Sequence, residues 1–307
     1  MSNSNIKEAI ILMNDFSERT GITSELSAQR YLWTDAFAVC NFLGLAMVTG
    51  EERYRNIALQ LVEQVHHTLG QHRNDDPRSG WISGLSAHAG EKHPTRSGLR
   101  IGKKLPERGP DDFFDERLEW DRDGQYFHYL TKWMHALDQV SRSTGESQYN
   151  FWARELAEAA HKTFTYHYSP GRSPRMYWKM SIDLKRPLVP SMGQHDPLDG
   201  YVTALQLRAT ADSLPKSITE PDLDKTTRDF MAMTAQANLA SPDPLGIGGL
   251  LVDAYRVHQL MLPGELSKES LVERLLGAAH TGLEYYAKSS ELQAPAEYRL
   301  AFRELGL

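Results

Sequence analysis

The sequence predicts an all-α protein, an (α/α) toroid built from about five to six helical hairpins. Three observations lead to this prediction. Apolar residues recur at helical spacing through most of the 307 residues. No segment reads as a convincing strand. One helix–turn–helix motif occurs twice, with identical internal offsets.

The repeated motif marks the turn of a helical hairpin. Its two copies are Thr49-Gly50-Glu51 followed by Tyr54, Ala58 and Leu61, and Thr144-Gly145-Glu146 followed by Tyr149, Ala153 and Leu156. Glycine commonly ends a helix because it adopts the left-handed conformation without steric cost. The glutamate then falls where the dipole of the next helix favours a negative charge. Each copy therefore predicts two antiparallel helices joined by a short turn.

Two further hairpins and two lone helices complete the predicted architecture. The hairpins pair residues 197–213 with 222–238, and residues 246–262 with 268–287. The lone helices, near residues 5–18 and 297–307, are expected to pair with each other and close a ring. We predict one domain over residues 1–307. Its interrupted last helix leaves open a C-terminal truncation of a longer, six-hairpin protein.

These serial hairpins resemble a known superfamily. The Thr-Gly-Glu-x-x-Tyr-x-x-x-Ala turn, with connections rich in Trp, Tyr and His, is similar to that of the six-hairpin glycosidase-like (α/α) toroids. That superfamily includes N-acylglucosamine 2-epimerases and unsaturated glucuronyl hydrolases, and the resemblance covers residues 30–290. Residues 33–36, Trp-Thr-Asp-Ala, resemble the Trp/Asp pairs of such enzymes, but no catalytic signature of the superfamily matches. The resemblance implies a fold and a carbohydrate substrate, and it leaves the reaction open.

Composition excludes several other classes of protein. The 34 basic and 40 acidic residues give a net charge of −6 without long blocks of either sign, which disfavours a nucleic-acid partner. The N-terminus does not read as a signal peptide, and we expect no membrane-spanning segment. The single cysteine, Cys40, is expected to be a buried thiol in a reducing cytoplasm. The oligomeric state is left open.

Two long connections are expected to gather at one end of the toroid. Residues 70–121 and 166–194 join successive hairpins, whereas the turns within hairpins are short. Because antiparallel helices reverse direction, all connections between hairpins lie at the end opposite the turns. Connections of this length are usually functional or disordered, and their tryptophans argue against disorder. The sequence therefore predicts an active face formed by these two loops and the starts of the first helix of each hairpin.

Titratable and aromatic side chains cluster at those positions. The candidate catalytic residues are Asp123, His195, Asp35, Asp121, His128 and Asp196. The candidate substrate-binding residues are Trp33, Trp81, Tyr126, Trp178, Lys179, Gln194 and Asp199. Residues 175–180 could form a strand-like lip with alternating faces, in which Trp178 would suit a sugar ring and Lys179 an acidic substituent. Glycoside hydrolysis needs two carboxyl groups, and Asp123 is the preferred acid because Gly124 and Tyr126 leave it beside free space and an aromatic wall. Epimerisation would instead use two groups tuned near neutrality, such as His128 and His195.

We therefore predict a carbohydrate-active enzyme, a glycoside hydrolase or a sugar epimerase or isomerase, that uses general acid/base chemistry without a cofactor or metal. Its expected partner is a sugar-like small molecule. A competing interpretation starts from Asp111-Asp112-Phe113-Phe114-Asp115, which resembles the magnesium-binding motif of isoprenoid synthases. A third is a helical scaffold that binds a ligand without reacting, in which the carboxylates would serve as helix caps and arginine partners.

Overall fold

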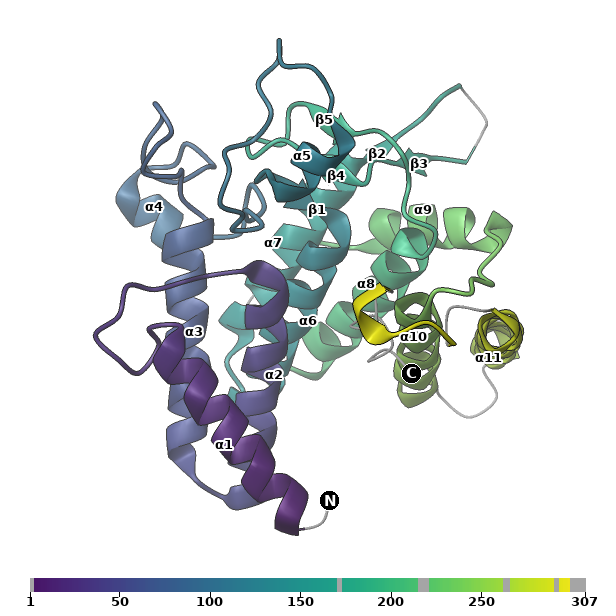
Figure 1. Cartoon of the computed structure of the whole chain (residues 1–307), viewed down its shortest axis with the longest axis horizontal. Coiled ribbons are helices and arrows are strands. Elements are labelled where there is room, and N and C mark those ends of the chain that lie inside the picture. Colours follow the sequence, from purple (N-terminus) through teal and green to yellow (C-terminus); the bar gives the residue numbers. More distant parts are fainter. Residues whose placement is uncertain (1–2, 170–172, 215–220, 262–265, 290–292, 299–307) are drawn as a thin grey trace.

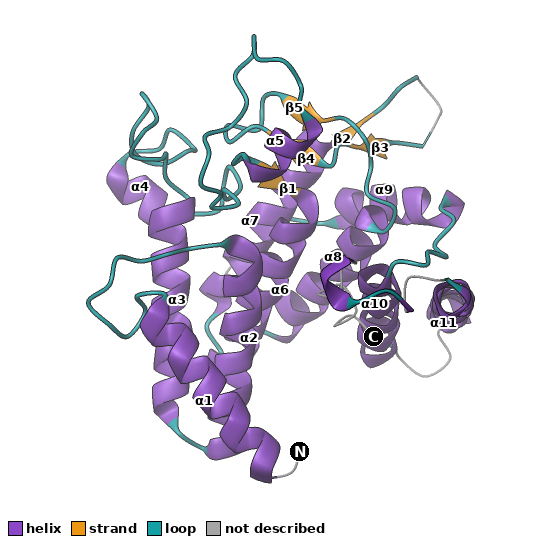
Figure 2. Cartoon of the chain, in the orientation of Figure 1, coloured by secondary structure: helices purple, strands orange, loops and turns teal. Residues whose placement is uncertain are grey.

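The computed structural model describes residues 3–169, 173–214, 221–261, 266–289 and 293–298. Within these ranges helices dominate, and a few short strands lie at one end of the molecule (Figures 1 and 2). The α-helices are α1 (Asn3–Arg19), α2 (Leu32–Thr49), α3 (Glu52–Leu69), α4 (Ala87–Lys92), α5 (Glu116–Asp121), α6 (Phe127–Thr144), α7 (Ser147–Phe164), α8 (Asp196–Ser213), α9 (Asp224–Gln236), α10 (Pro244–Gln259) and α11 (Leu266–Lys288).

Four hairpins follow one another along the chain. Helices α2 and α3, α6 and α7, α8 and α9, and α10 and α11 pack as pairs. The first members of the pairs also pack in series, α2 against α6, α6 against α8, and α8 against α10. Figure 1 shows this series as an arc in which α1 and α11 lie on opposite sides of the molecule. The partner expected to close the ring, a helix over residues 297–307, lies almost entirely outside the described residues.

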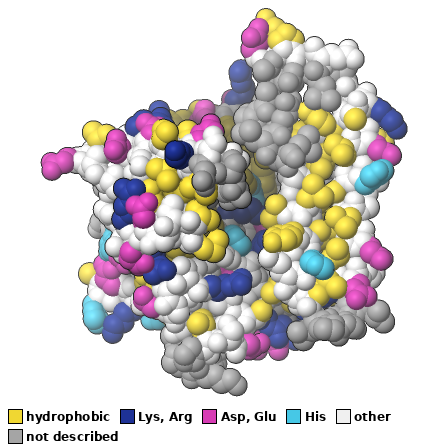
Figure 3. All heavy atoms as spheres, turned by 90° about the horizontal axis from the view of Figure 1, so that it is seen from below, with side chains coloured by type: hydrophobic (Ala, Val, Ile, Leu, Met, Phe, Trp, Pro, Cys, Tyr) yellow, Lys and Arg dark blue, Asp and Glu magenta, His cyan; other side chains and the backbone are white. Residues whose placement is uncertain are grey.

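The core has two parts that meet at α8. The larger part contains the apolar faces of α2, α3, α6 and α7, with Trp133, Tyr54 and Phe42 fully buried. The smaller part joins α8 to α10 and α11 around Leu198 and Leu275. Some apolar side chains of α10 and α11 stay exposed, and apolar atoms gather on the corresponding side of Figure 3.

The predicted Thr-Gly-Glu turns have the same structure in both copies. Gly50 and Gly145 end α2 and α6 in the left-handed conformation, with φ of 73° and 78°. In the first copy the Thr49 hydroxyl accepts a hydrogen bond from the Glu51 N–H at 3.1 Å. In the second, the Thr144 hydroxyl accepts the equivalent bond at 3.2 Å. The local sequence therefore determines this turn in both hairpins.

These glycines give a stability prediction with an internal control. We expect Gly145→Ala to lower the free energy of unfolding by about 1 kcal/mol, because alanine is strained at positive φ. Gly44→Ala, in the interior of α2 where an added Cβ meets nothing within 4 Å, should raise it by about 0.5–1 kcal/mol. Urea denaturation of both variants measures the two changes. Equal shifts in the same direction would contradict the turn assignment.

The long connections lie at the end of the molecule opposite the hairpin turns. Asp123 directly precedes the start of α6, and Thr144 lies at the far end of that helix. The start of α8 lies beside the start of α6, since Asp199 contacts Lys132. The loops and strands above these helix starts are visible at the top of Figure 1. This arrangement agrees with the predicted alternation of turns and connections.

The connections contain more regular structure than the sequence indicated. They carry α4, α5 and the strands β1 (Gln125–Tyr126), β2 (Thr165–Tyr166), β3 (Arg175–Met176), β4 (Lys179–Met180) and β5 (Pro187–Val189). Strands β1, β4 and β5 form one antiparallel sheet, and β2 pairs with β3 in another. The strand-like lip predicted over residues 175–180 contains β3 and β4, whereas the other strands were not predicted. All five are two or three residues long, which leaves little room for an alternating pattern. They tie the connection over residues 166–194 to the start of α6.

One helix corrects the expectation that no segment could span a membrane. By length and composition alone, α2 is long and apolar enough to cross a bilayer. A core helix passes the same test, so this is weak support for a membrane segment. Helix α2 packs against α1, α3 and α6, and its residues Leu32, Val39 and Phe42 are fully buried, as in a core helix.

Candidate functional site

An aromatic cluster forms where α2 and α6 begin. It comprises Tyr31, Trp33, Trp120, Tyr126, His128, Tyr129 and Trp178. Neighbouring rings have centroids between 4.8 and 6.3 Å apart. The pairing of β1 with β4 sets Tyr126 opposite Lys179 and so brings Trp178 onto the cluster. Three of the four aromatic residues predicted to share one site, Trp33, Tyr126 and Trp178, therefore lie together.

The aromatic cluster has a side that faces solvent. Trp120 is 49% exposed, and Phe37, whose ring lies 5.3 Å from that of Trp33, is 46% exposed. Trp33 and Trp178 are half-buried, whereas Tyr126 is buried beneath them. An apolar surface of this kind at the loop end of the helices can hold a ligand ring.

Trp81 does not join the aromatic cluster, contrary to the sequence-based prediction. Its ring packs 5.7 Å from that of His67 at the end of α3, and its indole fills the space beside Gly90. Trp81 is buried there. It therefore anchors the beginning of the connection over residues 70–121.

His128 contributes an unpaired polar atom to the aromatic cluster. Its ring is nearly parallel to that of Trp178, at 15° and 5.9 Å between centroids. The Nδ1 atom is buried and has no hydrogen-bond partner in the described structure. Burial, helped by the charge of Lys132, lowers the pKa of His128 to about 3, so the imidazole is neutral at physiological pH. A neutral imidazole can exchange hydrogen bonds with a ligand hydroxyl, but it is a poor general base.

A charged row continues from the aromatic cluster along α6 and α8. Lys132 binds Asp199 at 2.7 Å, Arg256 of α10 approaches the same carboxylate at 3.4 Å, and the Thr131 hydroxyl donates to it. Burial raises the pKa of Asp199, but these two cations outweigh burial and lower it to about 2. Asp199 is therefore ionised. In Figure 3, which shows the molecule from below, basic and histidine side chains lie in the hollow near the middle of the view.

Asp196 lies one helical turn before Asp199 and has the opposite electrostatic character. Its Oδ2 atom is buried and has no partner among the described residues. Burial and the charge of Asp199 raise the pKa of Asp196 to about 7. Gly193 packs so closely on this carboxyl that an added Cβ would approach Oδ2 to 2.4 Å. The pKa of Asp196 is thus raised and that of Asp199 is lowered. The two carboxyl groups of an active site that work as a general acid and a carboxylate commonly differ in this way.

Asp123, the acid preferred from the sequence, is fully buried in a different environment. It binds Arg100 at 2.6 Å and accepts a hydrogen bond from the Gly102 N–H at 3.0 Å. Arg73 approaches it at 3.6 Å. The free space expected beside Gly124 is filled, because an added Cβ there would meet the Met180 carbonyl oxygen at 2.8 Å. The carboxylate therefore ties the connection over residues 70–121 to the start of α6.

Of three other charged residues predicted for the site, two are held in ion pairs and one is exposed at a helix end. Asp35 lies 3.5 Å from Arg30 and accepts a hydrogen bond from the Tyr31 N–H, while burial raises its pKa to about 7. Lys179 is completely buried and donates to Glu119. Asp121 is exposed at the end of α5. Neither Asp35 nor Lys179 has a free side facing solvent.

His195 and Gln194 anchor the start of α8. The His195 Nε2 atom lies 2.7 Å from the Leu239 carbonyl oxygen, and burial lowers the pKa of this imidazole. Gln194 is exposed and donates to the carbonyl oxygens of Asn238 and Ala240. Both side chains thus hold the segment between α9 and α10 beside Asp196.

The acidic motif considered for magnesium has other partners. Asp112 binds Arg122 at 2.8 Å, and Asp115 caps α5 by accepting from the Leu118 N–H at 2.9 Å. Asp111 is exposed. Among the residues that the structure describes, no group of three or more His, Cys, Asp or Glu side chains is arranged to hold a metal ion.

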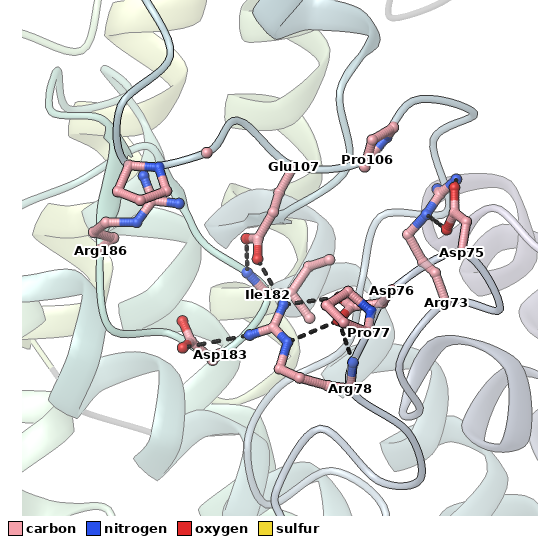
Figure 4. A pocket seen from close by; sticks show the side chains of 12 residues that line it. Arg73, Asp75, Asp76, Pro77, Arg78, Pro106, Glu107, Ile182, Asp183 and Arg186 are labelled. Carbon is pink, nitrogen blue, oxygen red and sulfur yellow. Dashed lines mark hydrogen bonds and ion pairs between the residues drawn. The ribbon is translucent and has the colours of Figure 1, made fainter.

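A pocket of about 390 Å³ lies between the two long connections (Figure 4). Arg78 reaches three carboxylates in it, Asp76 at 2.8 Å, Glu107 at 2.9 Å and Asp183 at 3.6 Å. Glu107 also accepts a hydrogen bond from the Ile182 N–H at 2.6 Å. These charges satisfy one another, so the pocket serves to join the two connections.

Sequence reasoning missed several residues that build the site. They are Trp120, Tyr129 and Lys103 around the aromatic cluster, Lys132 and Arg256 beside Asp199, and Arg100 beside Asp123. Lys132 follows His128 by one helical turn, a spacing that the sequence displays. The contact of Arg256 with Asp199 gave no comparable signal because the two residues are 57 positions apart.

Neither a protein-family model nor a curated protein sequence matches this chain.

Proposed function

We propose that this protein is a carbohydrate-active enzyme that hydrolyses a glycosidic bond by general acid/base catalysis. Two observations carry the proposal: the aromatic cluster is partly exposed, and two carboxyls at the start of α8 have pKa values shifted in opposite directions. One of them, Asp199, acts electrostatically on His128 of the cluster. The aromatic cluster would stack against the apolar face of a pyranose ring. Asp196 would be the acid, and the neutral His128 would position a ring hydroxyl.

Hydrolysis is better supported than epimerisation. Cleavage of the C–O bond requires a proton for the leaving oxygen, and Asp196 would hold one because its pKa is about 7. Water adds to the anomeric carbon, and the proton that it loses passes through solvent to restore the protonated form of Asp196. Epimerisation would require a base that removes a carbon-bound proton. Because the pKa values of both candidate imidazoles, His128 and His195, are lowered, neither is suited to that role.

A binding protein without catalysis is the second candidate. Asp123 and Asp35, two of the predicted catalytic carboxylates, are paired with buried or nearly buried arginines. That is the arrangement expected of carboxylates with a structural role. Both candidates share the aromatic cluster as the ligand site, so a binding experiment tests the site and a turnover experiment separates them.

Removal of an exposed ring from the aromatic cluster should weaken sugar binding. We expect Trp120→Ala to raise Kd by about ten-fold or more, because one stacking face worth roughly 1–2 kcal/mol is lost. Stability should change little, since Trp120 is 49% exposed. Calorimetric titration with glucose, galactose, mannose and the corresponding hexuronates measures the change.

Tyr255→Ala provides the matched control, because Tyr255 is 62% exposed on α10. This variant should bind like the parent protein. The site is wrong if both variants bind equally well, or if no sugar in the panel binds the parent.

A further inference from the structure

We infer that the sugar recognised by this site carries an anionic substituent, and that Lys103 binds it. The inference rests on the proposed function and adds the chemical class of the substrate. It starts from the position of Lys103, whose Nζ atom lies 5.2 Å from the ring centroid of Trp120 and 5.5 Å from that of Tyr31. The ammonium group is therefore held at the edge of the aromatic cluster.

The backbone of Lys103 is fixed on both sides. Its N–H donates to Asp123 at 3.4 Å, and its carbonyl oxygen accepts from Arg73 at 2.6 Å. The preceding Gly102 has a φ of 90°, and an added Cβ there would approach the Arg30 carbonyl oxygen to 2.3 Å. The side chain thus extends from a rigid point toward the rings, so little entropy is lost when a ligand contacts it.

Lys103 differs from the other cations around it because it has no acidic partner. Arg73, Arg100, Arg108, Arg122 and Lys179 each form an ion pair with an aspartate or glutamate. In the described part of the chain, no carboxylate lies within ion-pair distance of the Lys103 Nζ atom, which lies over the two aromatic rings. A half-buried ammonium left without a counter-charge is suited to an anionic ligand.

Lys179, the cation predicted from the sequence to meet an acidic substituent, cannot take this role. Its Nζ atom donates to the carbonyl oxygens of Glu119 and Arg122 at 2.7 and 2.8 Å and binds the Glu119 carboxylate at 2.9 Å. Two of its donors are hydrogen-bonded, its charge is paired with Glu119, and the side chain has no exposed surface. The half-buried Lys103 keeps its donors available beside the same rings.

Matched sugar pairs test this inference. Calorimetry compares glucose with glucuronate, galactose with galacturonate, and glucose with glucose 6-phosphate. Each pair is measured at about 50 mM and at about 0.5 M salt, because the Debye length is roughly three-fold shorter at the higher concentration. We expect the parent to bind at least one anionic member about ten-fold more tightly than its neutral counterpart, with a preference that salt reduces. Tighter binding of only the phosphate would support the ammonium site and identify phosphate as the anion.

Two lysine variants isolate the charge. Lys103→Met keeps most of the apolar length of the side chain without its charge, and it should abolish the preference for the anionic sugar, so that the two members of each pair bind with similar affinity. Lys104→Met removes the neighbouring exposed charge and should leave the preference intact. Equal affinity of the parent for neutral and anionic sugars would overturn the inference and leave the proposed function standing. Failure of every sugar to bind would overturn both.

Discussion

Asp196→Asn is expected to lower turnover by about 10²–10⁴-fold, because the variant cannot protonate the leaving oxygen. The measurement is the release of reducing sugar from a disaccharide that the parent cleaves. Aryl glycosides with a nitrophenolate leaving group provide a second readout. Nitrophenolate leaves without protonation, so the variant should lose much less activity on these substrates if Asp196 is the general acid.

The pH dependence of turnover follows from the same pKa. Asp196 must be protonated to act as an acid, so activity should fall as pH rises above about 7. Asp224→Asn is the matched control, because Asp224 begins α9 as Asp196 begins α8, but 47% of the Asp224 side chain is exposed and it pairs with Arg208. It should retain parent activity and the parent pH profile. Equal losses on both substrate types would exclude Asp196 as the proton donor.

Asp196→Asn should raise the stability of the folded protein at high pH, although it lowers turnover. The folded-state pKa of about 7 lies above the unfolded value, so the folded protein binds this proton more tightly. The ionised form is the costly one, and the parent therefore loses stability through this group as pH rises from about 4 to about 7. Asp196→Asn should be more stable than the parent at pH 8, by up to a few kcal/mol, and similar to it near pH 4. Denaturation at these two pH values measures the difference.

Asp123→Asn is expected to reduce the free energy of unfolding by about 3–5 kcal/mol, because it leaves Arg100 buried without its counter-charge. Asp75→Asn breaks an arginine pair of similar length, 2.7 Å to Arg73, but Asp75 is 55% exposed. That control should cost less than about 1 kcal/mol. Urea denaturation of both variants measures the contrast that burial creates.

A double variant keeps this prediction testable if Asp123→Asn does not fold. Arg100→Met combined with Asp123→Leu removes both charges, and it should recover much of the lost stability. The opposite result for the single variant, near-parent stability with turnover reduced about 10²-fold or more, would restore the catalytic role that the sequence indicated for Asp123.

The helical hairpins were predictable because their signals are local. Helix α8 was expected over residues 197–213 and spans Asp196–Ser213, and the Thr-Gly-Glu turns were expected where Gly50 and Gly145 end their helices. A helix boundary depends on residues within one or two turns, and glycine at positive φ acts through its own backbone. The direction of successive helices then places the long connections at one end.

The sequence by itself determined the helices, their order and the end of the molecule at which polar and aromatic residues gather. It did not distinguish Asp123 from Asp196, since both are aspartates next to the start of a first helix. Only the tertiary structure separates them. Arg100 approaches Asp123 from 23 residues away, whereas the buried Oδ2 atom of Asp196 has no partner in the part of the chain that the structure describes. The protonation state of a carboxyl depends on burial and on charges from distant segments, and no local pattern encodes either.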